Sequence, residues 1–245
     1  MNFLVVIPAR FKSTRFPGKP LADLAGSPMI EHVWRRCCQA VDSERVIIAT
    51  DDERIEAVAR GFGARVEMTS SECLTGTDRV AEVADRYPAD WYVNVQGDEP
   101  FLNPEDISRV LHSAAQSRND VAAVNAMSPI EDETSFHSPN VPKVVTDFSG
   151  RLLYISRSPI PVDKNNSFHT GFRQVGLYAF SPQALRLYGP SAPKARLESI
   201  EDIEVLRLLE NGRSVQMITV AGSGPAVDTP GDLEEVRDRL RLGRS

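Results

Sequence analysis

Several patterns that define common protein classes are missing from this chain of 245 residues. No apolar run approaches the length of about 20 residues that a membrane-spanning helix needs, so we expect no membrane insertion. The chain has three cysteines, Cys37, Cys38 and Cys73, of which two are adjacent. Because no CxxC spacing occurs, we expect buried or half-buried free thiols rather than a zinc site or a disulfide.

Motifs of several enzyme classes are missing as well. Gly61 and Gly63 do not complete the GxGxxG of a Rossmann dinucleotide site. The PGKP segment at residues 17–20 lacks the upstream glycine and the Ser/Thr of a Walker A loop. The four histidines have no metal-ligand spacing, and no GxSxG elbow occurs. These absences argue against a Rossmann enzyme, a P-loop enzyme and a hydrolase triad.

Acidic residues outnumber basic ones, 34 to 28. The formal net charge is −6, which argues against nucleic acid as a partner because binding to a phosphate backbone needs a basic face. The content of 41% hydrophobic and 25% charged residues is that of a globular protein. Met1 leads directly into an apolar run, without a basic leader or a small-residue cleavage site, so we expect a cytoplasmic location.

One loop, IPARFKSTRFPGKPL at residues 7–21, holds four cations close together. Its cations are Arg10, Lys12, Arg15 and Lys19. Gly18 permits a close approach of the backbone to a ligand, while Pro17 and Pro20 restrict the conformations of the loop. Side-chain cations and backbone N–H groups can then face one anion, which predicts a polyphosphate site. A solvated basic turn is the alternative.

Apolar runs alternate with helical patterns along the first half. The expected strands are residues 3–7, 45–50, 65–68, 91–95 and 121–127. Helices are expected between them, capped at Ser27, Asp51 and Asn103. This order predicts an α/β fold with a mainly parallel, twisted sheet flanked by helices. Since ligands bind at the carboxyl ends of such strands, the basic loop and QGDEP at residues 96–100 should open onto one crevice.

The second half has a different pattern. Short β-like runs separated by proline and glycine turns predict a mixed, partly antiparallel extension at about residues 128–180. It would cover the crevice or make a subunit contact. Helices are expected at residues 182–188 and 197–211, a strand at 214–220 and a last helix from Pro230. No long linker interrupts the chain, so residues 1–245 are predicted to form a single domain.

Two aspartates suit a hard cation. Asp98 in QGDEP lies at the carboxyl end of a predicted strand, and Mg²⁺ usually takes one or two carboxylates plus waters and substrate phosphates. Asp228, between a strand and the last helix, is the candidate for a second carboxylate. The alternative for Asp228 is that it only caps that helix.

Five segments, in this order along the chain, resemble the 3-deoxy-manno-octulosonate (Kdo) cytidylyltransferases. They are IPARFKSTRFPGKPL, TGTDRVAEV, VNVQGDEP, LYISRSPIP and AVDTPGDLEEV. The resemblance implies a nucleotide-diphospho-sugar transferase-like fold, a homodimer and a need for Mg²⁺. It also implies transfer of CMP from CTP to the anomeric hydroxyl of Kdo, an acidic 2-keto-3-deoxy sugar, for lipopolysaccharide or other surface-glycan synthesis.

The resemblance also implies roles for individual residues. Contacts to the triphosphate would come from Arg10, Ser13, Arg15 and Lys19, and the metal ligands would be Asp98 and Asp228. Around the cytidine would lie Thr77, Arg79 and Gln96. Arg157 would pair with the sugar carboxylate, with Tyr178 and Glu204 near the sugar. Each of three residues has a structural alternative that does not depend on the resemblance: Arg79 as a surface residue at a helix start, Arg157 in a salt bridge of the extension and Gln96 as a polar group at a strand end.

Two positions depart from the family's pattern on the sugar side. Gln174 stands where a histidine is usual and Val205 where a glutamine is usual, and both are expected to touch the sugar. A related acidic sugar such as 8-amino-Kdo is therefore an alternative acceptor, because polar pockets discriminate strongly between hydrogen-bonding groups. A nucleotidyltransferase for a phosphorylated neutral sugar and a catalytically silent nucleotide-binding protein are also compatible with a phosphate-binding loop of this kind.

Overall fold

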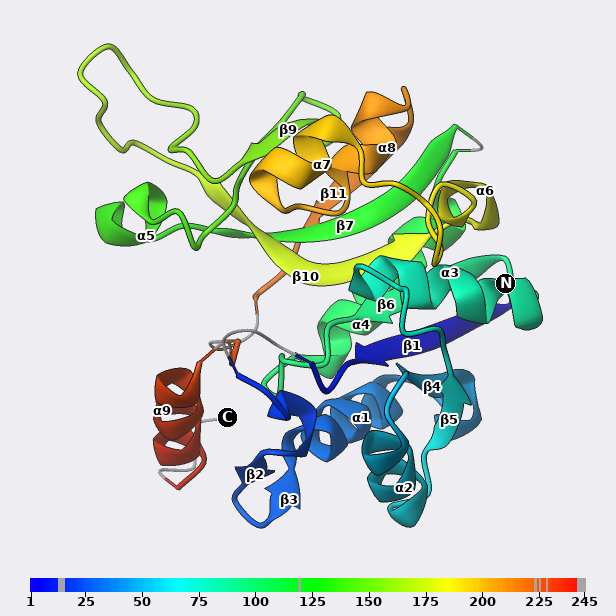
Figure 1. The fold of residues 1–245 in the computed structure, drawn as a ribbon. Helices are drawn as coiled ribbons and strands as arrows, with labels where there is room; N and C mark the ends of the chain where they lie inside the picture. Colours follow the sequence, from blue (N-terminus) through cyan, green and yellow to red (C-terminus); the bar gives the residue numbers. More distant parts are fainter. Residues whose placement is uncertain (13–15, 119, 223, 225, 228, 242–245) are drawn as a thin grey trace.

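The computed structural model describes residues 1–12, 16–118, 120–222, 224, 226–227 and 229–241, and its main element is a nine-stranded sheet (Figure 1). Seven strands follow the order β11-β7-β10-β6-β1-β4-β5, and β8 and β9 extend it beside β10. The strands are β1 (Phe3–Ala9), β4 (Val46–Thr50), β5 (Arg65–Met68), β6 (Trp91–Val95), β7 (Val121–Pro129), β8 (Lys143–Thr146), β9 (Leu152–Ser156), β10 (Phe172–Phe180) and β11 (Ser214–Thr219).

The strand directions confirm the predicted mainly parallel sheet. β1 pairs in parallel with β4 and β6, β4 with β5, and β11 with β7. β10 is antiparallel to both of its neighbours, β6 and β7, and β8 is antiparallel to β10 and β9. The mixed, partly antiparallel extension is therefore confirmed as well, and it grows from β10.

Helices cover both faces of the sheet, as predicted. They are α1 (Met29–Ala40), α2 (Glu53–Gly61), α3 (Gly76–Arg86), α4 (Pro104–Gln116), α5 (Glu133–His137), α6 (Pro182–Leu185), α7 (Arg196–Glu201), α8 (Leu206–Glu210) and α9 (Pro230–Arg241). One core joins α1, α2 and α4 to the sheet, and a second joins α3, α6 and α8 to it. Strands covered on both faces read as continuous apolar runs, which explains the sequence pattern.

A third, smaller core fixes the C-terminal helix. Leu233 and Val236 of α9 pack with Leu24, Met29 and Phe101. Leu24 belongs to the short hairpin of β2 (Asp23–Leu24) and β3 (Ser27–Pro28), and Figure 1 shows α9, in red, beside this hairpin. The chain end that carries the AVDTPGDLEEV segment is thus packed against the region that follows β1.

Some predicted helix boundaries are wrong. Pro28 rather than Ser27 is the residue that precedes α1, and both residues belong to β3 of the hairpin. Asp52, not Asp51, caps α2, and its carboxylate accepts a hydrogen bond from the Arg54 N–H at 3.0 Å. α4 begins as predicted, with Asn103 as its cap and Pro104 in the first turn.

The predicted helix at residues 197–211 is two helices. α7 ends at Glu201 because Asp202 adopts a left-handed conformation with φ of 51°, and α8 begins at Leu206. The predicted helix at 182–188 is also shorter, since α6 ends at Leu185.

The predicted free thiols are confirmed: Cys37 and Cys73 are buried, and Cys38 is half-buried. In the part of the chain that the structure describes, no helix has the length and apolar character to cross a membrane.

Candidate active site

A cavity of about 630 Å³ opens where the loops after β1 and β6 meet residues of the extension and of the α7–α8 turn. The predicted site residues that line it are Arg10, Lys19, Arg79, Gln96, Asp98, Arg157 and Glu204. The Lys19 ammonium lies 2.7 Å from Asp98 Oδ2. The prediction that the basic loop and QGDEP share one crevice is confirmed.

Glycines set the shape of this crevice. Gly18 has φ of 73°, and its N–H donates to the Phe11 carbonyl at 2.9 Å, so the loop turns back before Lys19 begins the short helix η1 (Lys19–Leu21). A Cβ on Gly97 would lie 2.8 Å from the Pro8 carbonyl oxygen. Only glycine lets the end of β1 approach the loop of Asp98 this closely. Ser13 and Arg15 lie outside the described residues.

The C-terminal segment reaches the same loop. The N–H of Val227 donates to the Asp98 carbonyl at 2.9 Å, and the Val227 side chain is fully buried. Asp228, the next residue, lies outside the described residues. In the described part of the chain, no group of three or more His, Cys, Asp or Glu side chains could hold a metal ion. One or two carboxylates suffice for Mg²⁺ bound with substrate phosphates, and Asp98 already accepts a cation, so this donor set fits Mg²⁺.

Glu204 belongs to the turn between α7 and α8, and its carboxylate lies at the N-terminus of α3. Its carboxylate accepts hydrogen bonds from the backbone N–H of Gly76 at 3.1 Å and of Thr77 at 3.0 Å, and from the Thr77 hydroxyl. Burial raises the pKa of Glu204, and these hydrogen bonds oppose that shift. Thr77 is fully buried and is not among the residues lining the cavity, so its side chain supports Glu204 from behind.

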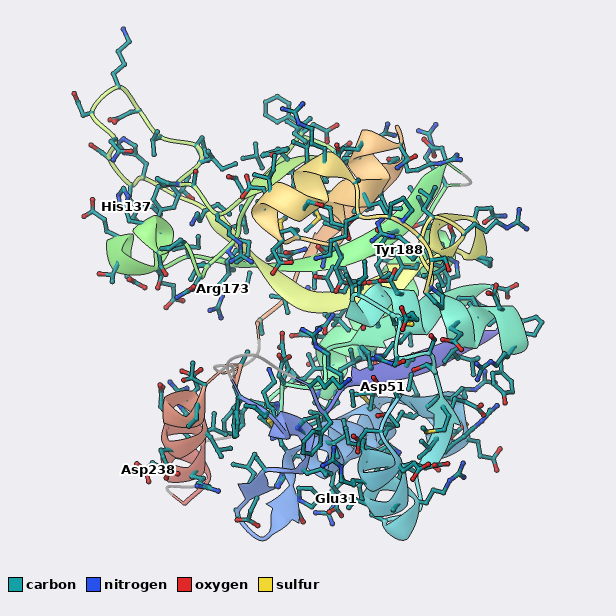
Figure 2. All side chains as sticks on the ribbon, in the orientation of Figure 1. Glu31, Asp51, His137, Arg173, Tyr188 and Asp238 are labelled. Atoms are coloured by element: carbon teal, nitrogen blue, oxygen red, sulfur yellow. The ribbon has the colours of Figure 1, made fainter. Side chains whose placement is uncertain are left out.

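Arg79 is buried, with 2% of its surface exposed, so the alternative of a surface residue is wrong. Its guanidinium donates to Thr69 Oγ1 at 2.7 Å and to the Ser70 carbonyl at 3.1 Å. It also pairs at 3.2 Å with Asp51, which follows β4 and is labelled in Figure 2. Arg79 is thus a fixed cation in the cavity wall.

Arg157 enters the cavity from the extension. Its guanidinium donates to the carbonyls of Pro139 at 3.0 Å, Asp202 at 3.3 Å and Glu201. Among the described residues, its side-chain hydrogen bonds therefore go to backbone carbonyls, two at the end of α7 and one in the turn after α5, rather than to a carboxylate. A guanidinium has five N–H donors, which leaves two beyond these three bonds for a ligand.

The other predicted sugar contacts do not line the cavity. Tyr178 is buried, its ring stacks on Phe180 at 5.5 Å, and burial raises its pKa. The Gln174 amide donates to Asn125 Oδ1 at 2.9 Å. Val205 has no exposed surface and belongs to the core between α8 and the sheet.

Sequence analysis missed several residues of the site. Lys194 and Asp202 line the cavity and form an ion pair at 3.0 Å, but they belong to no recognised motif. A buried ionic network behind the cavity was missed too. Arg207 contacts Glu198 at 2.6 Å and Asp78 at 3.4 Å, and its guanidinium lies over Tyr188, which Figure 2 labels. This network joins α8 to α7 and to the first turn of α3.

The fold is that of known nucleotidyltransferases. A solved cytidylyltransferase from Leptospira borgpetersenii matches 99% of this chain and 87% of its own with a TM-score of 0.67, at 16% identity. The family model described as Cytidylyltransferase matches residues 4–216. The chain is therefore a nucleotidyltransferase of the cytidylyltransferase class.

Closer relatives define the family more narrowly. A 3-deoxy-manno-octulosonate cytidylyltransferase from Geobacter sulfurreducens is 46% identical over 252 residues, which cover 98% of this chain and 100% of the relative. A solved CMP:2-keto-3-deoxy-manno-octonic acid synthetase complexed with CTP is 37% identical, with a TM-score of 0.91 and coverage of 99% of this chain and 100% of its own. The chain belongs to the 3-deoxy-manno-octulosonate cytidylyltransferase family.

Proposed function

We propose that the protein transfers CMP from CTP to the anomeric hydroxyl of Kdo and releases diphosphate. The observation that carries this proposal is that the cations after β1, the carboxylate of Asp98 and Arg157 of the extension all line the same cavity. Such a cavity combines groups for a triphosphate and for an acid in one place. The product, a CMP-activated acidic sugar, would serve lipopolysaccharide or other surface-glycan synthesis.

The residues act by position and charge. Attack of a sugar hydroxyl on the α-phosphorus builds negative charge on the phosphoryl oxygens and on the leaving diphosphate. Arg10 and Lys19, with Ser13 and Arg15 of the same loop, are the groups we assign to the triphosphate. Transfer between two oxygen atoms needs no protein nucleophile.

We assign Asp98 and Asp228 as the residues that would hold Mg²⁺. The Val227–Asp98 backbone bond at 2.9 Å supports this assignment because it ties the residue before Asp228 to Asp98. When bound, the ion would stabilise charge on the phosphates and lower the pKa of the attacking hydroxyl. Asp98 and Lys19 then have complementary roles, since Asp98 would hold the Mg²⁺ ion and Lys19 would hold the triphosphate.

The nucleoside side of the cavity would be formed by Gln96 and Arg79, with Thr77 behind them. The side chain of Gln96 lies against Gly76, where an added Cβ would come 3.3 Å from Gln96 Oε1. Glycine at this position thus lets the Gln96 amide pack directly against the first turn of α3 in the cavity wall. This arrangement supports the cytidine assignment carried by the family resemblance.

Kdo is the acceptor that we favour. The alternative acceptor, 8-amino-Kdo, rests on Gln174 and Val205, and neither is among the residues lining the cavity. Arg157 keeps two donors for the carboxylate that both sugars share. The homodimer stays a prediction from the family resemblance.

The test is diphosphate release with a matrix of donors and acceptors. CTP, UTP, ATP and dTTP are each combined with Mg²⁺ and with Kdo, 8-amino-Kdo, sialic acid or glucose 1-phosphate. We expect turnover with CTP and Kdo above every other combination. A preference for 8-amino-Kdo would support the alternative acceptor, and preference for glucose 1-phosphate would support a neutral-sugar enzyme. CTP binding without turnover on any acceptor would support a silent nucleotide-binding protein.

A further inference from the structure

Lys143, the first residue of β8, is a fully buried lysine behind the cavity. Its ammonium donates hydrogen bonds to two backbone carbonyls, at 2.8 Å to Ser138 and at 2.6 Å to Arg157. Burial lowers the pKa of Lys143, the nearby Arg157 lowers it further, and Glu201 raises it. Burying an ammonium is costly unless its donors are hydrogen-bonded, so the two bonds to carbonyls are what allow a lysine at this position.

Both carbonyls belong to segments that form the wall of the cavity. Ser138 begins the turn that supplies Asn140 and Pro142 to the lining, and Arg157 is itself a lining residue. The Lys143 ammonium therefore clamps the turn and the end of β9 together. It reaches this place because β8 pairs with β9 in the register that sets Lys143 opposite Ser156.

Glu201 holds Arg157 from the other side. Its carboxylate accepts hydrogen bonds from the Arg157 N–H at 2.9 Å and from the Ser156 hydroxyl at 2.7 Å. The Arg157 guanidinium also donates to the Pro139 carbonyl at 3.0 Å, in the turn that Lys143 clamps. The backbone of Arg157 is thus held between two buried or half-buried charges of opposite sign, and its side chain is held by backbone carbonyls on both sides.

We propose that Lys143 is a positioning residue for the acceptor: it sets the orientation of Arg157, and thereby the affinity for the acidic sugar, without touching the substrate. This inference rests on the proposed function, because it takes Arg157 as the partner of the sugar carboxylate. The triphosphate residues Arg10 and Lys19 come from the loop after β1, and the bonds of Lys143 do not reach that loop. Lys143 should consequently act on one substrate only.

The experiment compares Lys143→Met with wild type in steady-state assays of diphosphate release with CTP, Mg²⁺ and Kdo. The KM for Kdo should rise roughly 10- to 100-fold, since misplacing a binding group by about 1 Å costs up to about 100-fold. The KM for CTP should stay within about twofold of the wild-type value, because the hydrogen bonds of Lys143 do not reach the residues assigned to the triphosphate. Glu201→Gln, which loosens Arg157 from the opposite side, should give the same split even if Lys143→Met fails to fold.

Val144→Ala is the matched control, since Val144 is a core residue next to Lys143 on the same strand. It should lower the Tm and leave both KM values unchanged. Equal increases in the two KM values, or a lower Tm with an unchanged KM for Kdo in both Lys143→Met and Glu201→Gln, would overturn the inference. If wild type releases no diphosphate with Kdo, the proposed function is wrong. If wild type is active but the variants do not raise the KM for Kdo selectively, only the inference about Lys143 is wrong.

Discussion

The Lys19 ammonium contacts the Asp98 carboxylate at 2.7 Å, although 78 residues separate them along the chain. One residue follows β1 and the other follows β6, and these strands are parallel neighbours in the sheet. A cation and a carboxylate therefore meet at the carboxyl ends of the strands, where α/β folds bind ligands, and we assign them to phosphate and to metal.

The first prediction separates the roles of this pair. Lys19→Met should raise the KM for CTP roughly 10- to 100-fold, because a hydrogen bond to a charged group is worth about 1.5–3 kcal/mol. Asp98→Asn should lower kcat by about 1000-fold, since metal charge stabilisation supplies several kcal/mol and each 1.36 kcal/mol is about tenfold in rate. Steady-state diphosphate release measures both, with the exposed Asp120→Asn as control. Near-normal turnover by Asp98→Asn would remove Asp98 from the metal site.

A second prediction concerns the close approach at Gly97. Gly97→Ala places a Cβ 2.8 Å from the Pro8 carbonyl oxygen, so the loop carrying Asp98 must shift away from β1. We expect at least about a tenfold loss of kcat, because small misplacements of catalytic groups cost up to about 100-fold. Gly61→Ala is the control, since a Cβ there meets nothing within 4 Å. A fully active Gly97→Ala enzyme would show that this approach is not needed.

A third prediction uses the raised pKa of Glu204. The folded state holds the Glu204 proton to higher pH than the unfolded state does. Its contribution to stability is thus fully present below the ordinary value of 4.5 and is lost as pH rises through the raised pKa. The Tm of wild type minus that of Glu204→Gln should therefore fall between pH 4 and pH 8, with the exposed Glu44→Gln as control. A difference that grows with pH would contradict the raised pKa.

A fourth prediction addresses the buried network of Arg207, Glu198 and Asp78. Arg207→Met leaves two buried carboxylates without their cation and should cost about 3–5 kcal/mol in urea unfolding. Adding Glu198→Gln should recover part of this loss, because it removes one uncompensated charge. Arg213→Met, at an exposed position, should change stability by about 0.5 kcal/mol or less. Additive losses in the double variant would mean that the pair is not coupled.

The sequence predicted the central sheet and the crevice shared by the loops after β1 and β6 because those features are local. An apolar run followed directly by cations or by QGDEP marks both a strand and the edge where its ligand groups lie. The break at Asp202 was missed because it depends on one aspartate with a left-handed φ of 51°, and an aspartate in the sequence does not by itself predict that conformation.

The rest of the site depended on contacts between distant residues. Glu204 reaches the first turn of α3 across 128 residues, and Arg207 reaches Asp78 across 129. No spacing rule gives such pairs. One signal was available in the sequence. Lys143 interrupts the apolar run VPKVVTDF, and a lysine at a core position of a strand indicates a buried charge that needs hydrogen-bond partners.

The most direct test of the central claim follows the α-phosphorus of CTP. Wild type is incubated with Mg²⁺, Kdo and CTP labelled with ³²P at the α or at the γ position. We predict that the α label appears in a CMP-Kdo product and the γ label in diphosphate, in equal amounts and only when Kdo is present. Diphosphate release without Kdo, or no transfer of the α label to the sugar, would contradict the proposed CMP transfer.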